Sequence, residues 1–176
     1  MEIADTGIRR ALPSDAGAIA RVHVASWQTT YLGIIPDGEI AQRTLEKREN
    51  YWREALSGTV EGVFVAEEVL MRIVGFASCG PAREDTPGFT GELYAIYLLD
   101  RVQRQGIGRG LVRAVAQELL GRGIQSMFVW VLENNPSRAF YEALGGKPGV
   151  TKQIIMGNAS YVEVAYGWED IDPLAR

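Results

Sequence analysis

Three glycines and two arginines gather in one short segment, residues 103–111, whose sequence is QRQGIGRGL. The segment follows an apolar run typical of a buried strand and precedes a periodic apolar run typical of an amphipathic helix. A helix start has unpaired backbone N–H groups and a partial positive charge, so it receives anions. Glycines let the backbone approach a phosphate closely, and Arg104 and Arg109 add charged donors. The segment therefore predicts a phosphate-binding turn.

Two common phosphate-binding motifs do not fit this segment. A Walker A loop needs Gly-Lys-Ser or Gly-Lys-Thr, and the chain has no such triplet. A dinucleotide fingerprint needs a third glycine where Leu111 stands, and it belongs to the first strand of its fold. Kinase-type and dinucleotide interpretations are therefore excluded. The alternative left open is a turn whose glycines serve packing alone.

The chain offers few residues for metal or covalent chemistry. Its single histidine, His23, and single cysteine, Cys79, exclude an intramolecular disulfide, a cysteine-rich zinc site and a centre with two His ligands. We therefore expect no metal. His23 lies among apolar residues, which favours packing or capping, although a role as proton acceptor stays open. Cys79 ends an apolar run and is expected to be a small buried side chain.

Composition and charge bound the class of protein. A chain of 176 residues with 47% hydrophobic and 23% charged residues is typical of one globular domain, which we place at residues 1–176. The net charge of −4 argues against nucleic acid as a partner. No apolar run is long enough to span a membrane, and the acidic start of the chain is not typical of a secretory signal. We expect a cytoplasmic protein without a membrane partner.

Hydrophobic periodicity predicts strands and helices that alternate along the chain. The expected strands are residues 6–12, 62–67, 73–79, 92–99, 126–132, 150–155 and 161–168, and the expected helices are 13–26, 36–56, 107–121 and 135–145. An aromatic-rich connection is expected at 27–35 and a loop at 81–91. This order predicts an α/β class with a mixed (α+β) sheet flanked by helices.

Two sequence blocks resemble the GNAT superfamily of N-acetyltransferases. Residues 96–108, IYLLDRVQRQGIG, resemble its acetyl-CoA-binding motif, in which Gln103, Gly106 and Gly108 match the Gln/Arg-x-x-Gly-x-Gly/Ala core. Residues 130–146, WVLENNPSRAFYEALGG, resemble its next block of strand, Asn, and a helix with Phe-Tyr. The two blocks stand in the family's order and separation.

The resemblance implies a fold and a co-substrate. The implied fold is a central, mostly antiparallel sheet of about six to seven strands with a splayed pair, flanked by about four helices. The implied co-substrate is acetyl-CoA, whose pantetheine arm would pair with backbone groups of the splayed strand. The residues implied in binding it are Ile96, Tyr97, Leu98, Gln103, Arg104, Gln105, Gly106, Ile107, Gly108, Arg109, Gly110 and Asn135.

The resemblance also implies direct attack by an acceptor amine on the thioester. A protonated amine has no lone pair, so a base must take its proton, and the leaving thiolate benefits from an acid. Tyr141 matches the family's acid. Glu92 stands 14 residues before Gly106, the offset of the catalytic glutamate in histone-type members. A water chain as base, and a capping role for Glu92, stay open.

The acceptor is the least defined part of the prediction. Trp27 and Tyr31 fall where the family builds its acceptor pocket, and Tyr94 is a candidate for positioning a water, while core packing stays open for all three. The expected acceptor is a primary amine of a small molecule or protein. The alternatives are an inactive acyl-CoA-binding module and O-acyl transfer. The resemblance also leaves a homodimer open.

Overall fold

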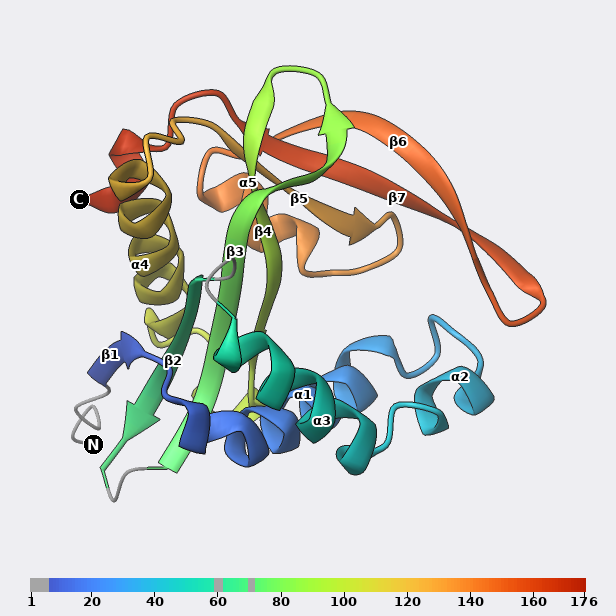
Figure 1. Cartoon of the computed structure of the whole chain (residues 1–176). Coiled ribbons are helices and arrows are strands. Elements are labelled where there is room, and N and C mark those ends of the chain that lie inside the picture. Colours follow the sequence, from blue (N-terminus) through green and yellow to red (C-terminus); the bar gives the residue numbers. More distant parts are fainter. Residues whose placement is uncertain (1–6, 59–61, 70–71) are drawn as a thin grey trace.

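A computed structural model describes residues 7–58, 62–69 and 72–176, and its centre is one seven-stranded sheet (Figure 1). The strand order is β1-β2-β3-β4-β5-β7-β6, and every neighbouring pair is antiparallel except β4 and β5. The strands are β1 (Gly7–Arg10), β2 (Gly62–Glu68), β3 (Arg72–Thr86), β4 (Phe89–Leu98), β5 (Met127–Leu132), β6 (Lys147–Met156) and β7 (Ala159–Trp168). The mixed, mostly antiparallel sheet that the sequence predicts is confirmed.

Helices cover both faces of the sheet (Figure 1). They are α1 (Ala16–Tyr31), α2 (Asp37–Ala41), α3 (Leu45–Ser57), α4 (Ile107–Gly121) and α5 (Arg138–Ala143). One core lies between the sheet and α4 with α5, and it contains Leu111, Val115 and Tyr141. A second core lies between the sheet and α1 with α3, where Trp52 meets Phe76 edge to face at 4.9 Å. The two cores fix the sheet from opposite sides.

Three expected boundaries are wrong. The helix expected at 36–56 is two helices, because Thr44 interrupts it and caps α3 by accepting the Lys47 N–H through its hydroxyl. The first helix does not end at residue 26 but continues through the aromatic segment to Tyr31. The loop expected at 81–91 is the hairpin of β3 and β4, which turns at Gly88 with φ +88°. Residue 6 of the first expected strand lies outside the described residues.

The parallel pair of β4 and β5 is short. Its register includes only Gly91 opposite Met127 and Glu92 opposite Phe128, and Gly91 N–H donates to Ser126 O at 3.0 Å. Beyond Glu92 the two strands diverge, while β4 stays paired with β3 as far as Leu98. The edge of β4 that faces β5 is therefore without a strand partner over its second half, which is the splay that the resemblance implies.

His23 belongs to the second core and not to a proton-transfer site. Its Nδ1 accepts the Trp52 indole N–H at 3.1 Å, and its ring stacks on Tyr97 at 5.0 Å. Burial, reinforced by the positive charges of Arg48 and Arg43, lowers the pKa of His23 to about 3. The ring is therefore neutral in the folded protein, and the packing interpretation of this residue is the one the structure favours.

This burial predicts a pH-dependent stability. An unfolded histidine titrates near pH 6.5, so between about pH 3 and 6.5 the unfolded chain binds the additional proton, and stability falls as pH drops through that window. Lowering the pH from 7 to 5 should reduce the free energy of unfolding by about 2 kcal/mol through His23 alone. Urea unfolding of the wild type and of His23→Gln at pH 7 and pH 5 measures this change, which should be smaller in the variant. Equal pH dependence in the two proteins would contradict the assignment.

Candidate active site

The turn between β4 and α4 presents backbone N–H groups at a helix start. Gly106 is the N-cap of α4 with φ +84°, and Arg104 has φ +59°, so two residues adopt left-handed backbone within three positions. The first helical bond runs from Gly110 N–H to Gly106 O. The N–H groups of Ile107, Gly108 and Arg109 therefore have no acceptor within the helix. Such a concave run of donors fits an anion.

Two of the motif's glycines are also required for packing. A Cβ at Gly108 would lie 3.2 Å from the Phe140 ring, and a Cβ at Gly110 would meet the Ile8 side chain. These glycines let α4 approach α5 and β1. Gly106 has no atom within 4 Å of such a Cβ, so its backbone conformation alone explains the glycine. The packing alternative therefore holds for two of the three glycines and not for the first.

Polar side chains of the motif brace this turn. The Gln103 amide donates to Asp100 Oδ1 at 3.2 Å, and the Gln105 amide donates to Arg101 O at 3.0 Å. Both side chains are exposed, as are Arg104 and Arg109. The two glutamines fix the loop's path, and the two arginines are placed where they can add charge beside the N–H groups.

The free edge of β4 ends directly at this turn. Leu99 N–H donates to Val74 O at 2.9 Å, so in an antiparallel ladder Leu99 and Tyr97 direct their backbone groups toward β3. Ile96 and Leu98 then direct theirs toward the splay. The Ser26 hydroxyl donates to Leu98 O at 3.1 Å, which anchors α1 to this edge. The sequence-predicted strand residues are therefore placed next to the glycine turn.

Three tyrosines and one asparagine gather at the mouth of the splay. Tyr31 makes polar contacts with Tyr97 and Asn135, and Tyr31 and Tyr141 interact electrostatically. Burial raises the pKa of Tyr141 above its ordinary value, and Tyr31 adds to the shift. Asn135 is buried and its Oδ1 accepts the Ser137 N–H at 2.9 Å, which holds the loop before α5. The phenol of Tyr141 therefore stays protonated at neutral pH and has a proton to donate.

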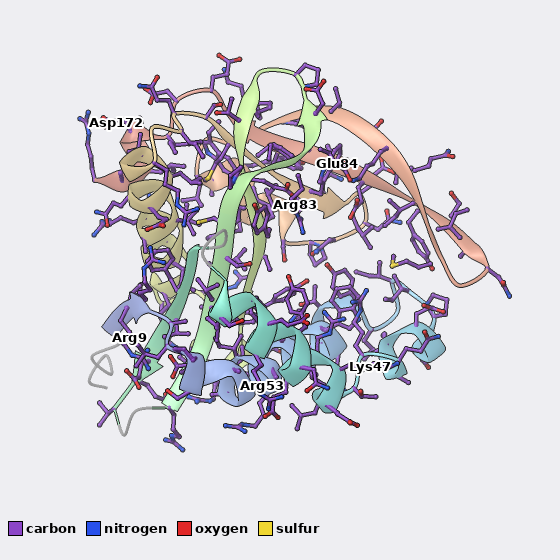
Figure 2. The ribbon with its side chains drawn as sticks, in the orientation of Figure 1. Arg9, Lys47, Arg53, Arg83, Glu84 and Asp172 are labelled. Carbon is purple, nitrogen blue, oxygen red and sulfur yellow. The ribbon has the colours of Figure 1, made fainter. Side chains whose placement is uncertain are left out.

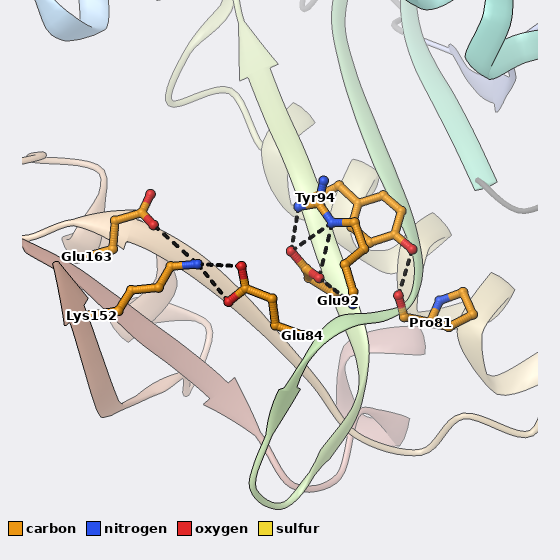
Figure 3. A network of polar contacts seen from close by, with 7 residues as sticks. Pro81, Glu84, Glu92, Tyr94, Lys152 and Glu163 are labelled. Atoms are coloured by element: carbon orange, nitrogen blue, oxygen red, sulfur yellow. Dashed lines mark hydrogen bonds and ion pairs between the residues drawn. The ribbon is translucent and has the colours of Figure 1, made fainter. Parts of the chain in front are cut away.

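Glu92 lies at the closed end of the splay in a clamp formed by Arg83 (Figure 3). Its carboxylate accepts the Arg83 N–H at 2.9 Å and the guanidinium at 2.5 Å, and only 2% of the residue is exposed. The Arg83 guanidinium also lies 4.2 Å from the centre of the Tyr94 ring. The Tyr94 hydroxyl donates to Pro81 O at 2.6 Å. A carboxylate with these donors is held firmly in one position.

Sequence analysis missed three side chains on this face of the sheet. Lys152 on β6 lies opposite Glu163 on β7, and its ammonium lies 4.2 Å from the Trp130 ring and 3.7 Å from the Glu163 carboxylate. Lys152 also pairs with Glu84 at 2.7 Å, which ties the β3–β4 hairpin to β6 (Figure 3). Because Val164 and Tyr166 are in the core, strand alternation places Glu163 on the opposite face. This alternation along β7 was the sequence signal from which the position of Glu163 could have been predicted.

Burial raises the pKa of Glu163, and the negative charges of Glu84 and Glu92 add to the shift while Lys152 opposes it. The carboxylate is half-buried and also acts on Tyr31, whose pKa it helps to raise beside the larger effect of burial. Glu163 therefore faces the tyrosine group and not bulk solvent alone. It is a second carboxylate, besides Glu92, on the acceptor side of the sheet.

Two of the expected acceptor residues lie together and one lies apart. Trp27 and Tyr31 on α1 have ring centroids 4.1 Å apart, and they pack with Ile35, Ile40 and residues of the β6–β7 hairpin. Tyr94 instead faces Arg83 and the β3–β4 hairpin. Trp27 and Tyr31 thus form a wall of the acceptor side, and Tyr94 stands at the Glu92 end.

The described residues were also compared with the expectations for metal binding, membrane insertion and the single cysteine. No three His, Cys, Asp or Glu side chains in residues 7–58, 62–69 and 72–176 are grouped so as to hold a metal ion. No helix in this part of the chain is both long and apolar enough to cross a membrane. Cys79 is fully buried in the first core, as expected.

The split sheet and the N–H turn define an acyltransferase-type fold, and comparisons with known proteins agree. A family model described as FR47-like protein matches residues 83–153. Over 167 residues, 95% of each chain, the protein is 42% identical to the uncharacterized N-acetyltransferase YuaI of Bacillus subtilis (strain 168). The chain belongs to the GNAT superfamily of N-acetyltransferases, and the expectation of such an enzyme is confirmed.

Solved structures share the fold at low sequence identity. The structure of yncA from Salmonella typhimurium, solved with acetyl-CoA, has a TM-score of 0.68 and 20% identity, covering 96% of this chain and 95% of that one. The paia N-acetyltransferase of Thermoplasma acidophilum, solved in complex with coenzyme A, has a TM-score of 0.66 and 19% identity, covering 91% and 98%. The likeness extends over nearly the whole chain.

The left-handed backbone at Gly106 gives a direct test of the turn. Gly106→Ala adds a methyl group in open space, so its effect comes from the backbone alone. A left-handed alanine costs about 1 kcal/mol, and relief of this strain would displace the N–H groups of the turn. We expect CoA affinity, measured by titration calorimetry, to fall about tenfold. Gly121→Ala, at the other end of α4 and also in open space, is the control and should bind CoA normally. Normal affinity in Gly106→Ala would show that the turn does not hold the diphosphate.

Proposed function

We propose that the protein transfers the acetyl group of acetyl-CoA directly to a primary amine of a small molecule or protein. The observation that carries this proposal is the continuity of the free β4 edge, the N–H turn before α4 and the buried Tyr141 phenol. The turn, from Arg104 to Gly110, would hold the diphosphate. The backbone of Ile96 and Leu98, with the Asn135 loop, would hold the pantetheine arm, and the thioester would lie beside Tyr141. The related structures solved with CoA or acetyl-CoA support this assignment.

Tyr141 is the proposed general acid. The leaving thiolate needs a proton as the carbon–sulfur bond breaks, and a positioned donor contributes roughly 10² to 10⁴ in rate. The raised pKa of Tyr141 keeps its proton in place throughout the neutral range. The Tyr141 ring packs against Phe140, Tyr166 and Trp168, which restricts its orientation. The same pKa makes the phenol unsuitable as a base.

Glu92 is the proposed base and acts through a water. Its carboxylate already accepts the Arg83 guanidinium and backbone N–H, so direct contact with the acceptor nitrogen would require breaking this clamp. A water at the closed end of the splay would relay the proton from the amine while the clamp stays intact. Positioning of both reactants at the split supplies the remaining rate enhancement.

Tyr141→Phe tests the acid. The variant should lower kcat by about 10²-fold, because the thiolate leaves without a proton, while CoA affinity stays unchanged. Release of free thiol from acetyl-CoA measures the rate, and titration calorimetry measures the affinity. Tyr166→Phe is the control, since its ring lies 6.2 Å from Tyr141 and its hydroxyl is bonded to Glu142 instead. Full activity in Tyr141→Phe would remove this residue from the mechanism.

Glu92→Gln tests the base through the pH profile. We expect a loss of about 10²-fold in kcat/KM at pH 7 that shrinks toward pH 9, because more of the acceptor amine is then already deprotonated. Glu49→Gln, a carboxylate of α3 that is paired with Arg53, is the control and should keep the wild-type pH profile. A loss in Glu92→Gln that is equal at all pH values would assign Glu92 to holding Arg83 alone.

CoA binding without transfer to any amine or peptide would instead favour an acyl-CoA-binding module, and transfer to hydroxyl compounds alone would favour O-acylation.

A further inference from the structure

We propose that the acceptor is an amine that carries a carboxylate, as an amino acid does, and that Arg43 binds this carboxylate. The inference rests on the proposed acetyl transfer and adds the chemical class of the acceptor. It assigns a specificity-determining role to a residue outside the motifs of the family. Arg43 stands on the wall formed by Trp27, it has no carboxylate partner, and the charges around it leave it without neutralisation.

Arg43 lies on the wall of the acceptor side. It follows α2, and its guanidinium carbon lies 3.7 Å from the centre of the Trp27 ring. Trp27 in turn contacts Tyr31 at 4.1 Å and Tyr97 at 6.4 Å between ring centroids. A guanidinium held over an indole face can still offer N–H groups at its edge to a planar, two-oxygen partner. The stack therefore presents a preformed carboxylate fork next to the tyrosines.

The positive charge at this wall has no carboxylate partner. Within residues 7–58, 62–69 and 72–176, neither Arg43 nor Arg48 is at ion-pair distance from an Asp or Glu. Both are half-buried, and the Arg48 Nε and the Trp27 Nε1 are buried without an acceptor in the same part of the chain. Arg53 on α3, by contrast, is paired with Glu49. Half-buried cations without partners are costly, and an anionic ligand removes the cost.

The charges of the surrounding groups support the same conclusion. Burial, and then the neighbouring Arg48, lower the pKa of Arg43, while Tyr97, Tyr31 and the more distant Glu39 only partly oppose this. The positive charges thus act on each other and are not neutralised by Glu39. A carboxylate bound at the edge of the Arg43 guanidinium would offset this unfavourable charge.

A carboxylate of the protein, Glu163, acts on the same tyrosine group. Tyr31 feels both poles, because Glu163 raises its pKa and Arg43 lowers it beside the larger effect of burial. Tyr31 also interacts with Tyr141, the proposed acid. Charges of both signs therefore act on the tyrosine group, and the negative one, Glu163, is already paired with Lys152 while Arg43 has no such partner. The carboxylate of an amino acid can supply the missing partner of Arg43.

The experiment compares matched acceptors that differ only in the anion. Leucine, methionine, phenylalanine, glutamate and glycine are each paired with the corresponding amide and with the decarboxylated amine, and a peptide with a free N-terminus is added. Acetyl transfer is followed by thiol release, and binding by thermal shift in the presence of CoA, which needs no turnover. At least one amino acid should exceed its amide and its decarboxylated amine by about 10- to 100-fold in kcat/KM, as a charged hydrogen-bonded pair provides.

Variants then assign the preference to one side chain. Arg43→Gln should reduce the preference for the acid over the amide to near unity while CoA affinity stays unchanged. Arg43→Lys should keep part of it, since the charge remains without the planar fork. Arg53→Gln is the control, because Arg53 lies on the outer side of α3 and is paired with Glu49 (Figure 2). It should keep the full preference.

The outcomes separate this inference from the proposed function. Equal kcat/KM for acids, amides and decarboxylated amines overturns the inference and leaves acetyl transfer standing. Transfer to the peptide but to no amino acid also overturns the inference and leaves acetyl transfer standing. An acid preference that survives in a folded, CoA-binding Arg43→Gln protein also overturns it. Transfer to no acceptor, with CoA bound, overturns the proposed function and this inference together.

Discussion

The site depends on the point at which β4 and β5 separate. Two pairs of residues join these strands, Gly91 with Met127 and Glu92 with Phe128, and beyond them β4 has a neighbour on one side only. Unpaired backbone groups at a strand edge bind another extended chain readily. Pairing with β3 holds β4 in place as far as Leu98. This free edge is where we propose that the extended arm of the co-substrate adds to the sheet.

Two different kinds of interaction meet at this split. On the side of α4, backbone N–H groups and glycines form an anion site that depends little on side-chain identity. On the side of α1, aromatic rings and unevenly placed charges form a surface that depends on side chains almost entirely. Tyr141 lies where the two meet. The first kind of interaction suits a common co-substrate, and the second suits an acceptor that differs from one relative to another.

The sequence was informative where the backbone determines the function. The glycine turn, the helix after it and the apolar strand before it all follow from local chemistry, and the resemblance to the GNAT superfamily supplied the split and Tyr141. The roles proposed around Arg43 and Glu163 could not be predicted from the sequence, because residues near them, Ile40 and Tyr161, come together only in the folded protein. The break at Thr44 and the turn at Gly88 were local signals that the predicted boundaries overlooked. Glu92 was expected, but its clamp by Arg83 depends on the hairpin that was taken for a loop.

Hydrogen exchange of the backbone amides with and without CoA tests the central claim most directly. Because the ligand is expected to pair with main-chain groups, binding should slow exchange at residues 96–98 and 104–110, and much less in β1, β6 and α3. Exchange protection confined to other segments, or identical exchange in both states at saturating CoA, would contradict the account.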